Sequence, residues 1–266
     1  MSPEWLLYPA LGVVAGLLAG LLGVGGGLVL VAALAWLLPL QGVPTEAAMH
    51  AALATSLASI IVTAAASARA HHRRGSVLWP TVAWLLPGML LGGWLGSGLA
   101  TRLSGDALRW LVVGYCLLAA VQLAWDRPPA VAEVANSPPL GPGLSLAGVA
   151  IGVLSALVGI GGGSMTVPLL VWRGATPVRA VGTSSACGVG IGLSAALGYA
   201  TLPAVSGMPA GSWGYVVLPA ALGIAATSLF AAPLGARLAH RLSGLALKRV
   251  FAGFLLLVAL TLIGGR

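Results

Sequence analysis

Charged residues are scarce in this chain: only 7% of its 266 residues are Asp, Glu, Lys or Arg. A water-soluble domain carries about 25% charged residues, so this chain cannot cover a water-facing surface of its size. Hydrophobic residues make up 59%, and the mean hydropathy is +1.02. The sequence therefore predicts an integral membrane protein and excludes a disordered chain, a collagen-like fibre and a secreted disulfide scaffold.

Acidic residues and cysteines are also rare. The five acids all lie at the ends of apolar segments or between them: Glu4, Glu46, Asp106, Asp126 and Glu133. A carboxylate proton relay or a carboxylate cation site at mid-membrane is therefore disfavoured. The two cysteines, Cys116 and Cys187, lie in separate apolar runs, so we expect no disulfide framework, no metal site and no cofactor.

Motifs for catalysis and for nucleic-acid binding are missing. The sequence has neither a GxSxG nor an HExxH motif, and we expect that the protein is not an enzyme. Its net charge of +8 comes from basic residues scattered between apolar runs, which disfavours a nucleic-acid partner and is typical of loops that set membrane orientation. No Lys or Arg precedes the first apolar run, so we expect that run to be membrane structure rather than a signal peptide.

Long apolar segments dominate what is present. Most are at least about 20 residues long, the length that a helix needs to cross the hydrocarbon core. Eight can be delimited, at residues 5–38, 46–69, 77–100, 106–125, 143–172, 177–202, 213–237 and 245–264. A polar, proline-rich linker at 126–142 separates an N-terminal half, 1–125, from a C-terminal half, 143–266.

The two halves resemble each other in three places that occur in the same order. LLGVGGGLVLV at 21–31 matches LVGIGGGSMTV at 157–167, ATSLAS at 54–59 matches GTSSAC at 182–187, and TRLSGDALRW at 101–110 matches HRLSGLALKR at 240–249. Internal duplication is common in transporters, whose substrate sites lie between the repeats. The sequence therefore predicts an all-α, polytopic integral membrane transporter with two homologous halves.

The first and fifth segments are unusually long, and each has a glycine cluster near its middle. Because glycine costs about 1 kcal/mol relative to alanine inside a helix, the clusters should break both helices. Each broken segment either crosses the membrane or folds back as a re-entrant pair of half-helices. Crossing segments would put 5 and 8 Lys/Arg on the two sides, whereas re-entrant segments would put 10 and 3, which fits the positive-inside rule better. In the re-entrant geometry each half crosses three times, so the halves would form inverted repeats.

Backbone amides at the two glycine breaks are the first candidate substrate-binding groups. Backbone within a membrane satisfies its hydrogen bonds internally unless it faces protein or a wet cavity, so a break at mid-segment indicates a cavity. The free N–H groups and the positive dipole end of each second half-helix would suit an anion. The candidates are Gly25, Gly26, Gly27, Gly161, Gly162 and Gly163. The alternative interpretation is close helix packing through small residues.

Hydroxyl side chains form the second candidate group. They are Thr55, Ser56, Ser164, Thr183 and Ser184. A hydroxyl can donate to an anion without the cost of burying a cation, and the Thr-Ser pair recurs in both halves. Alternatively, such side chains bond to their own helix carbonyls or join helices to one another.

The duplicated GxGGG motif, followed in each half by Thr-Ser and an RLSG turn, resembles the TauE/SafE family of sulfite and organosulfonate exporters over nearly the whole chain. The resemblance implies a multi-pass transporter in the inner membrane for small sulfur-containing anions such as sulfite or sulfoacetate. The second half carries the fuller pattern, with Ser164 and Pro168 where the first half has Leu28 and Ala32. We therefore expect the second half to supply more polar contacts.

Together these features predict a transporter, embedded in the lipid bilayer, that binds a small anion near the midplane and exports it by alternating access. Three alternatives stay open: an anion channel with the same site, an intramembrane enzyme, and a membrane subunit that transports nothing.

Overall fold

The computed structural model describes residues 7–22, 26–125, 138–203, 206–239 and 244–264. In this part of the chain the secondary structure is almost entirely helical. The helices are α1 (Leu7–Leu22), α2 (Gly27–Leu40), α3 (Thr45–His72), α4 (Trp79–Ala100), α5 (Gly105–Trp125), α6 (Pro142–Val158), α7 (Gly163–Trp172), α8 (Pro177–Thr201), α9 (Leu218–Ala239) and α10 (Gly244–Gly264). Two short antiparallel strands, β1 (Ser212–Trp213) and β2 (Val216–Val217), form a hairpin before α9.

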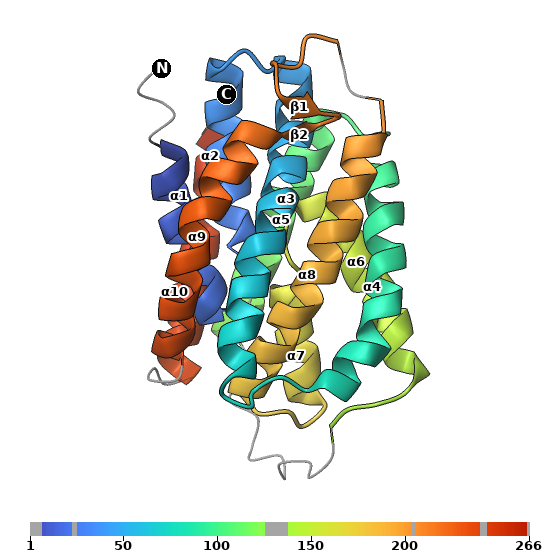
Figure 1. Cartoon of the computed structure of the whole chain (residues 1–266), viewed down its shortest axis with the longest axis vertical. Coiled ribbons are helices and arrows are strands. Elements are labelled where there is room, and N and C mark those ends of the chain that lie inside the picture. Colours follow the sequence, from blue (N-terminus) through green and yellow to red (C-terminus); the bar gives the residue numbers. More distant parts are fainter. Residues whose placement is uncertain (1–6, 23–25, 126–137, 204–205, 240–243, 265–266) are drawn as a thin grey trace.

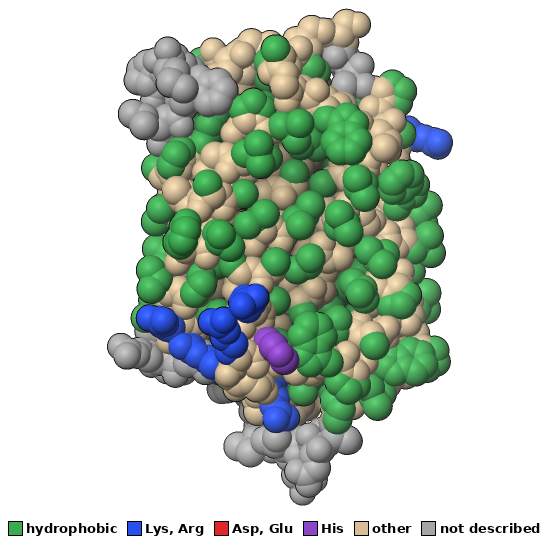
Figure 2. All heavy atoms as spheres, viewed as in Figure 1, with side chains coloured by type: hydrophobic (Ala, Val, Ile, Leu, Met, Phe, Trp, Pro, Cys, Tyr) green, Lys and Arg blue, Asp and Glu red, His purple; other side chains and the backbone are tan. Residues whose placement is uncertain are grey.

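Four helices in the described part are long and apolar enough to cross a membrane: α3, α4, α8 and α9. Large apolar side chains such as Leu91, Trp94 and Phe230 are exposed on the outside of the bundle. Figure 2 shows such side chains spread over the middle of the molecule. A surface of this composition suits lipid and not water. The chain is therefore a polytopic helical membrane protein.

Both overlong segments are broken, and in both the chain folds back. A Cβ atom on Gly26 would lie 2.3 Å from the carbonyl oxygen of Ala15, so α2 begins beside the middle of α1. A Cβ atom on Gly162 would lie 3.1 Å from Cγ2 of Ile151, so α7 likewise begins beside α6. Figure 1 shows α2 towards the end of the bundle where both chain termini lie, and α7 towards the opposite end. Inverted repeats would give this placement, and they stay a prediction.

The seventh segment begins later than its apolar residues predict. We expected a helix from residue 213, but the hairpin occupies Ser212 to Val217 and α9 begins at Leu218. Gly211 and Gly214 have φ angles of 85° and 56°, which turn the chain where a helix would otherwise start. In the predicted linker, residues 126–137 lie outside the described residues.

The two halves interlock through their first and fourth helices. Helix α1 packs along α9, and α6 packs along α4, while α3 and α8 lie against each other at the centre. Glycines allow the close approach: a Cβ atom on Gly16 would lie 2.8 Å from the carbonyl oxygen of Ser228, and one on Gly92 would lie 2.2 Å from that of Val149. The pairing brings both breaks to the middle of the bundle.

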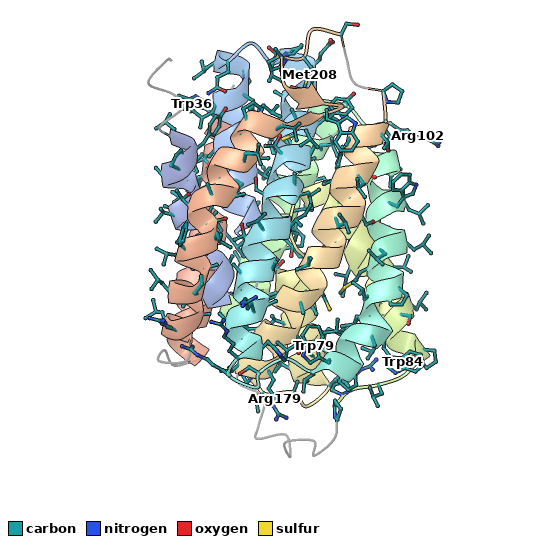
Figure 3. All side chains as sticks on the ribbon, in the orientation of Figure 1. Trp36, Trp79, Trp84, Arg102, Arg179 and Met208 are labelled. Atoms are coloured by element: carbon teal, nitrogen blue, oxygen red, sulfur yellow. The ribbon has the colours of Figure 1, made fainter. Side chains whose placement is uncertain are left out.

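The arginines in the described part gather at one end of the bundle, which we call the basic end. This end holds the last turns of α3 and α9, the residue after α7 and the first turn of α8, with Arg69, Arg73, Arg74, Arg173, Arg179 and Arg237. Figure 3 shows Arg179 with Trp79 and Trp84 at this end, and Arg102 with Trp36 and Met208 at the other. Most of the basic side chains visible in Figure 2 also lie towards the basic end.

Candidate functional site

The two glycine breaks touch each other. A Cβ atom on Gly27 would lie 2.3 Å from the carbonyl oxygen of Gly159 and 3.0 Å from Cα of Ile160. The breaks also share one backbone conformation: Gly26 and Gly162 precede α2 and α7 in the left-handed region, with φ angles of 71° and 74°. Only glycine adopts this conformation without strain. The repeated glycines therefore produce two matched helix starts in contact.

Ser56 of α3 bridges the two breaks. Its hydroxyl group, which is fully buried, lies 3.1 Å from the carbonyl oxygen of Gly27 and 2.9 Å from that of Gly159, and donates to both. One proton shared between carbonyls of two different halves fixes the relative position of the breaks. In this conformation the Ser56 hydroxyl is engaged by the protein's own backbone.

Thr55 and Thr183 occupy matched structural positions. Oγ1 of Thr183 accepts the backbone N–H of Leu78 at 3.0 Å and donates to the carbonyl oxygen of Arg179 at 2.7 Å. Oγ1 of Thr55 accepts the backbone N–H of Val217 at 3.0 Å. Leu78 and Val217 immediately precede α4 and α9, so each threonine holds the start of the fourth helix of a half. Next to these residues, Ser184 is also fully buried.

The second break leaves a run of backbone amides without backbone partners. The last backbone hydrogen bond at the end of α6 is donated by the N–H of Ile160, and the first one of α7 is donated by the N–H of Met165. Between them, the amides of residues 161–164 donate to no backbone carbonyl in the described part of the chain. These amides lie at the positive dipole end of α7, and Gly161 to Gly163 are buried. Such a set of donors can hold an oxyanion.

Two hydroxyl groups beside this break have no hydrogen-bond partner. Ser155 of α6 and Thr166 of α7 are fully buried, and neither Oγ of Ser155 nor Oγ1 of Thr166 finds a partner among the described residues. Oγ of Ser155 lies 3.3 Å from where a Cβ atom on Gly162 would be. A buried polar group without a partner costs about 1–3 kcal/mol, so a bound ligand or water is the natural explanation.

A further hydroxyl reaches the second break from α5. The hydroxyl group of Tyr115 forms a hydrogen bond with that of Ser164, the second residue of α7. The second break is therefore surrounded by hydroxyl groups from three helices. No group of three or more His, Cys, Asp or Glu side chains that could hold a metal ion occurs among the described residues.

The comparison with protein families identifies the chain. Residues 8–262 match the sequence model of the family described as sulfite exporter TauE/SafE. The chain belongs to the TauE/SafE family. The relatives of this TauE/SafE chain include a "Probable membrane transporter protein" of Haemophilus influenzae, 38% identical over 97% of each chain. A protein of Xylella fastidiosa (strain Temecula1) with the same name is 36% identical over 70% of each chain. No solved structure matches significantly.

The structure brings together most of the site residues that the sequence predicts in this TauE/SafE chain. Gly26, Gly27 and Gly161 to Gly163 lie at the contacting breaks, whereas Gly25 lies outside the described residues. The hydroxyl group of Ser56 bonds to both breaks, whereas those of Thr55 and Thr183 bond to backbone groups before α9 and α4.

Sequence reasoning missed Ser155, Thr166 and Tyr115. An alignment of the halves carries a signal for the first two. At the spacing that pairs Gly26 with Gly162, Ser155 pairs with Ala19 and Thr166 pairs with Leu30. A hydroxyl opposite an apolar residue in the repeat marks a position where the two halves differ in function or in packing.

Proposed function

We propose that this protein exports small sulfur-containing anions, sulfite or organosulfonates, across the inner membrane by alternating access at the glycine breaks. The observation that carries the proposal is the run of amides at residues 161–164, at the start of α7. They donate to no backbone carbonyl in the described part, and Gly161 to Gly163 are buried. The family name, sulfite exporter TauE/SafE, supports the substrate class.

Neutral donors suit a transporter because a site must release what it binds. The arginines of the described part lie towards the ends of the bundle, so the site offers amides and hydroxyls in place of a fixed cation. The positive-inside rule puts the basic end in the cytoplasm. An inside-negative potential then favours the exit of each anionic charge by about 2.3 kcal/mol per 100 mV, so export needs no coupling ion.

Flux measurements on the purified full chain in proteoliposomes test the proposal. The panel is sulfite, sulfoacetate, sulfate and thiosulfate, with protein-free liposomes as the control. We expect saturable flux of sulfite or sulfoacetate at a turnover typical of carriers. A flux that does not saturate and is orders of magnitude faster would indicate a channel, chemical conversion of the anion would indicate an enzyme, and no flux of any anion would refute the substrate class.

A further inference from the structure

We propose that the substrate anion binds at the second break alone, and that the first break is structural. The second-break donors, as we call them, are the amides of residues 161–164 and the hydroxyl groups of Ser155 and Thr166. This inference rests on the proposed function, because it locates the anion site of the same transporter. It also restricts the anion site to one of the two halves' glycine motifs, although the motif itself is duplicated.

At the first break, Gly26 has the same left-handed conformation as Gly162, but the aligned side chains are apolar. Its residues at the positions of Ser155, Ser164 and Thr166 are Ala19, Leu28 and Leu30, and all three are fully buried. The RLSG turns align Tyr115 with Phe254 in the same way. Each side-chain donor found at the second break is therefore replaced by a hydrocarbon side chain at the aligned position of the other half.

In the described part of the chain, the fully buried Ser and Thr hydroxyls without a partner both belong to the second break. The bundle contains many other fully buried Ser and Thr side chains, and these bond to protein groups. Thr63, for example, donates to the carbonyl oxygen of Ser59 and to Oγ of Ser228, both at 2.9 Å. Of the fully buried Ser and Thr side chains in the described part, Ser155 and Thr166 are the two without a partner. Ser155 lies beside Gly162, and Thr166 belongs to the first turn of α7, which begins with the amides that an oxyanion would contact.

The surroundings indicate the shape of the ligand. Besides Ser155, the nearest atoms to a Cβ atom placed on Gly162 would be Cδ1 of Ile191, at 2.6 Å, and Cγ2 of Ile151, at 3.1 Å. The Ser155 hydroxyl of α6 thus lies beside the start of α7 together with two hydrocarbon side chains. The ligand class that fits is a single sulfur oxyanion group, bare as in sulfite or carrying a short organic tail as in a small sulfonate.

Two conservative variants remove the hydroxyls: Ser155→Ala and Thr166→Val. Each is measured for KM and turnover with sulfite and sulfoacetate in proteoliposomes and for thermal unfolding in detergent. Losing one hydrogen bond to an anion should raise KM about tenfold or more. The unfolding temperature without anion should stay the same or rise, because each variant removes a buried group that lacks a partner.

Thr63→Val is the matched control, since it removes an equally buried threonine hydroxyl that has partners. We expect it to lower the unfolding temperature and leave KM unchanged. Equilibrium dialysis with radiolabelled sulfite should find one anion per chain, and two would overturn the inference. Unchanged KM values in Ser155→Ala and Thr166→Val would also overturn this inference. The proposed function would still stand in that case, provided that the wild type transports the anion. If the wild type neither binds nor moves any anion of the panel, the proposed function itself fails.

Discussion

At the scale of single residues, Thr55 and Thr183 show how a polar residue that recurs in both halves can stabilise the fold. Each accepts a backbone N–H just before a fourth helix, from Val217 in one case and from Leu78 in the other. Both side chains are fully buried. Water cannot replace the acceptor of such an N–H inside a membrane protein. Removing the acceptor should therefore lower the free energy of unfolding.

The Thr183→Val variant tests this role. We expect it to destabilise the protein by about 1–3 kcal/mol, because the N–H of Leu78 loses its acceptor. Thermal unfolding in detergent measures the loss, and KM for sulfite should change less than twofold. A variant with wild-type stability and a strongly raised KM would place the Thr183 hydroxyl on the substrate instead.

The sequence could propose hydroxyl residues for the site but could not say which of them are available. The hydroxyl group of a Ser or Thr in a helix either donates to the carbonyl oxygen four residues earlier or points towards another group. Ser185 bonds back to Val181 at 3.0 Å and Thr183 to Arg179 at 2.7 Å, whereas Ser155 does neither and finds no partner in the described part. That choice depends on neighbouring helices, which no single sequence displays.

At the scale of helices and strands, the breaks were the most predictable feature. Glycine weakens a helix and allows a left-handed residue, and both effects act locally, so the clusters mark where α2 and α7 begin. The hairpin of β1 and β2 was not predicted. Its residues include three buried ones, Tyr215, Val216 and Val217. A short run of buried hydrophobic residues is compatible with a strand as well as with a helix.

The pairing of α4 with α6 depends on glycines in the same helical row, and Gly92 is one of them. A Cβ atom there would lie 2.2 Å from the carbonyl oxygen of Val149, so Gly92→Ala should push the helices apart and cost about 1–3 kcal/mol. Gly98 lies in the same helix with nothing within 4 Å of its Cβ position. Gly98→Ala should therefore be neutral or stabilise the protein by up to about 1 kcal/mol.

Thermal unfolding of the two alanine variants in the same detergent measures this difference. The close approach matters to the whole bundle because α4 belongs to the first half and α6 to the second. Gly92→Ala should therefore also reduce anion flux, even though Gly92 contacts none of the second-break donors. Equal unfolding temperatures for both variants would show that the helices can separate without cost.

At the scale of the whole molecule, the distribution of arginine predicts the orientation in the membrane. The basic end carries Arg69, Arg73, Arg74, Arg173, Arg179 and Arg237, whereas Arg102 lies at the opposite end (Figure 3). Composition alone predicted such a bias only if the broken segments fold back, and the contacts of Gly26 and Gly162 are those of folded-back segments. Local glycine chemistry and global charge thus point to the same topology.

Inverted repeats stay a prediction of this topology, and one pair of residues can test it. Thr45 begins α3 after the first folded-back segment, and Arg173 directly follows α7 at the end of the second; both are exposed. In parallel repeats the two would lie on the same side of the membrane. In inverted repeats they lie on opposite sides, with Arg173 in the cytoplasm, because its end carries most of the arginines.

Labelling with a membrane-impermeant maleimide distinguishes the two cases. Thr45→Cys and Arg173→Cys are each made in a background in which the buried Cys116 and Cys187 are replaced by alanine. In intact cells we expect Thr45→Cys to react and Arg173→Cys to react only after permeabilisation, while the background without cysteine stays unlabelled. Five arginines remain at the basic end of the Arg173→Cys variant, so its orientation should persist. Labelling of both positions from the same side would rule out inverted repeats, and with them an alternating-access cycle in which the halves exchange roles about the contact between Gly27 and Gly159.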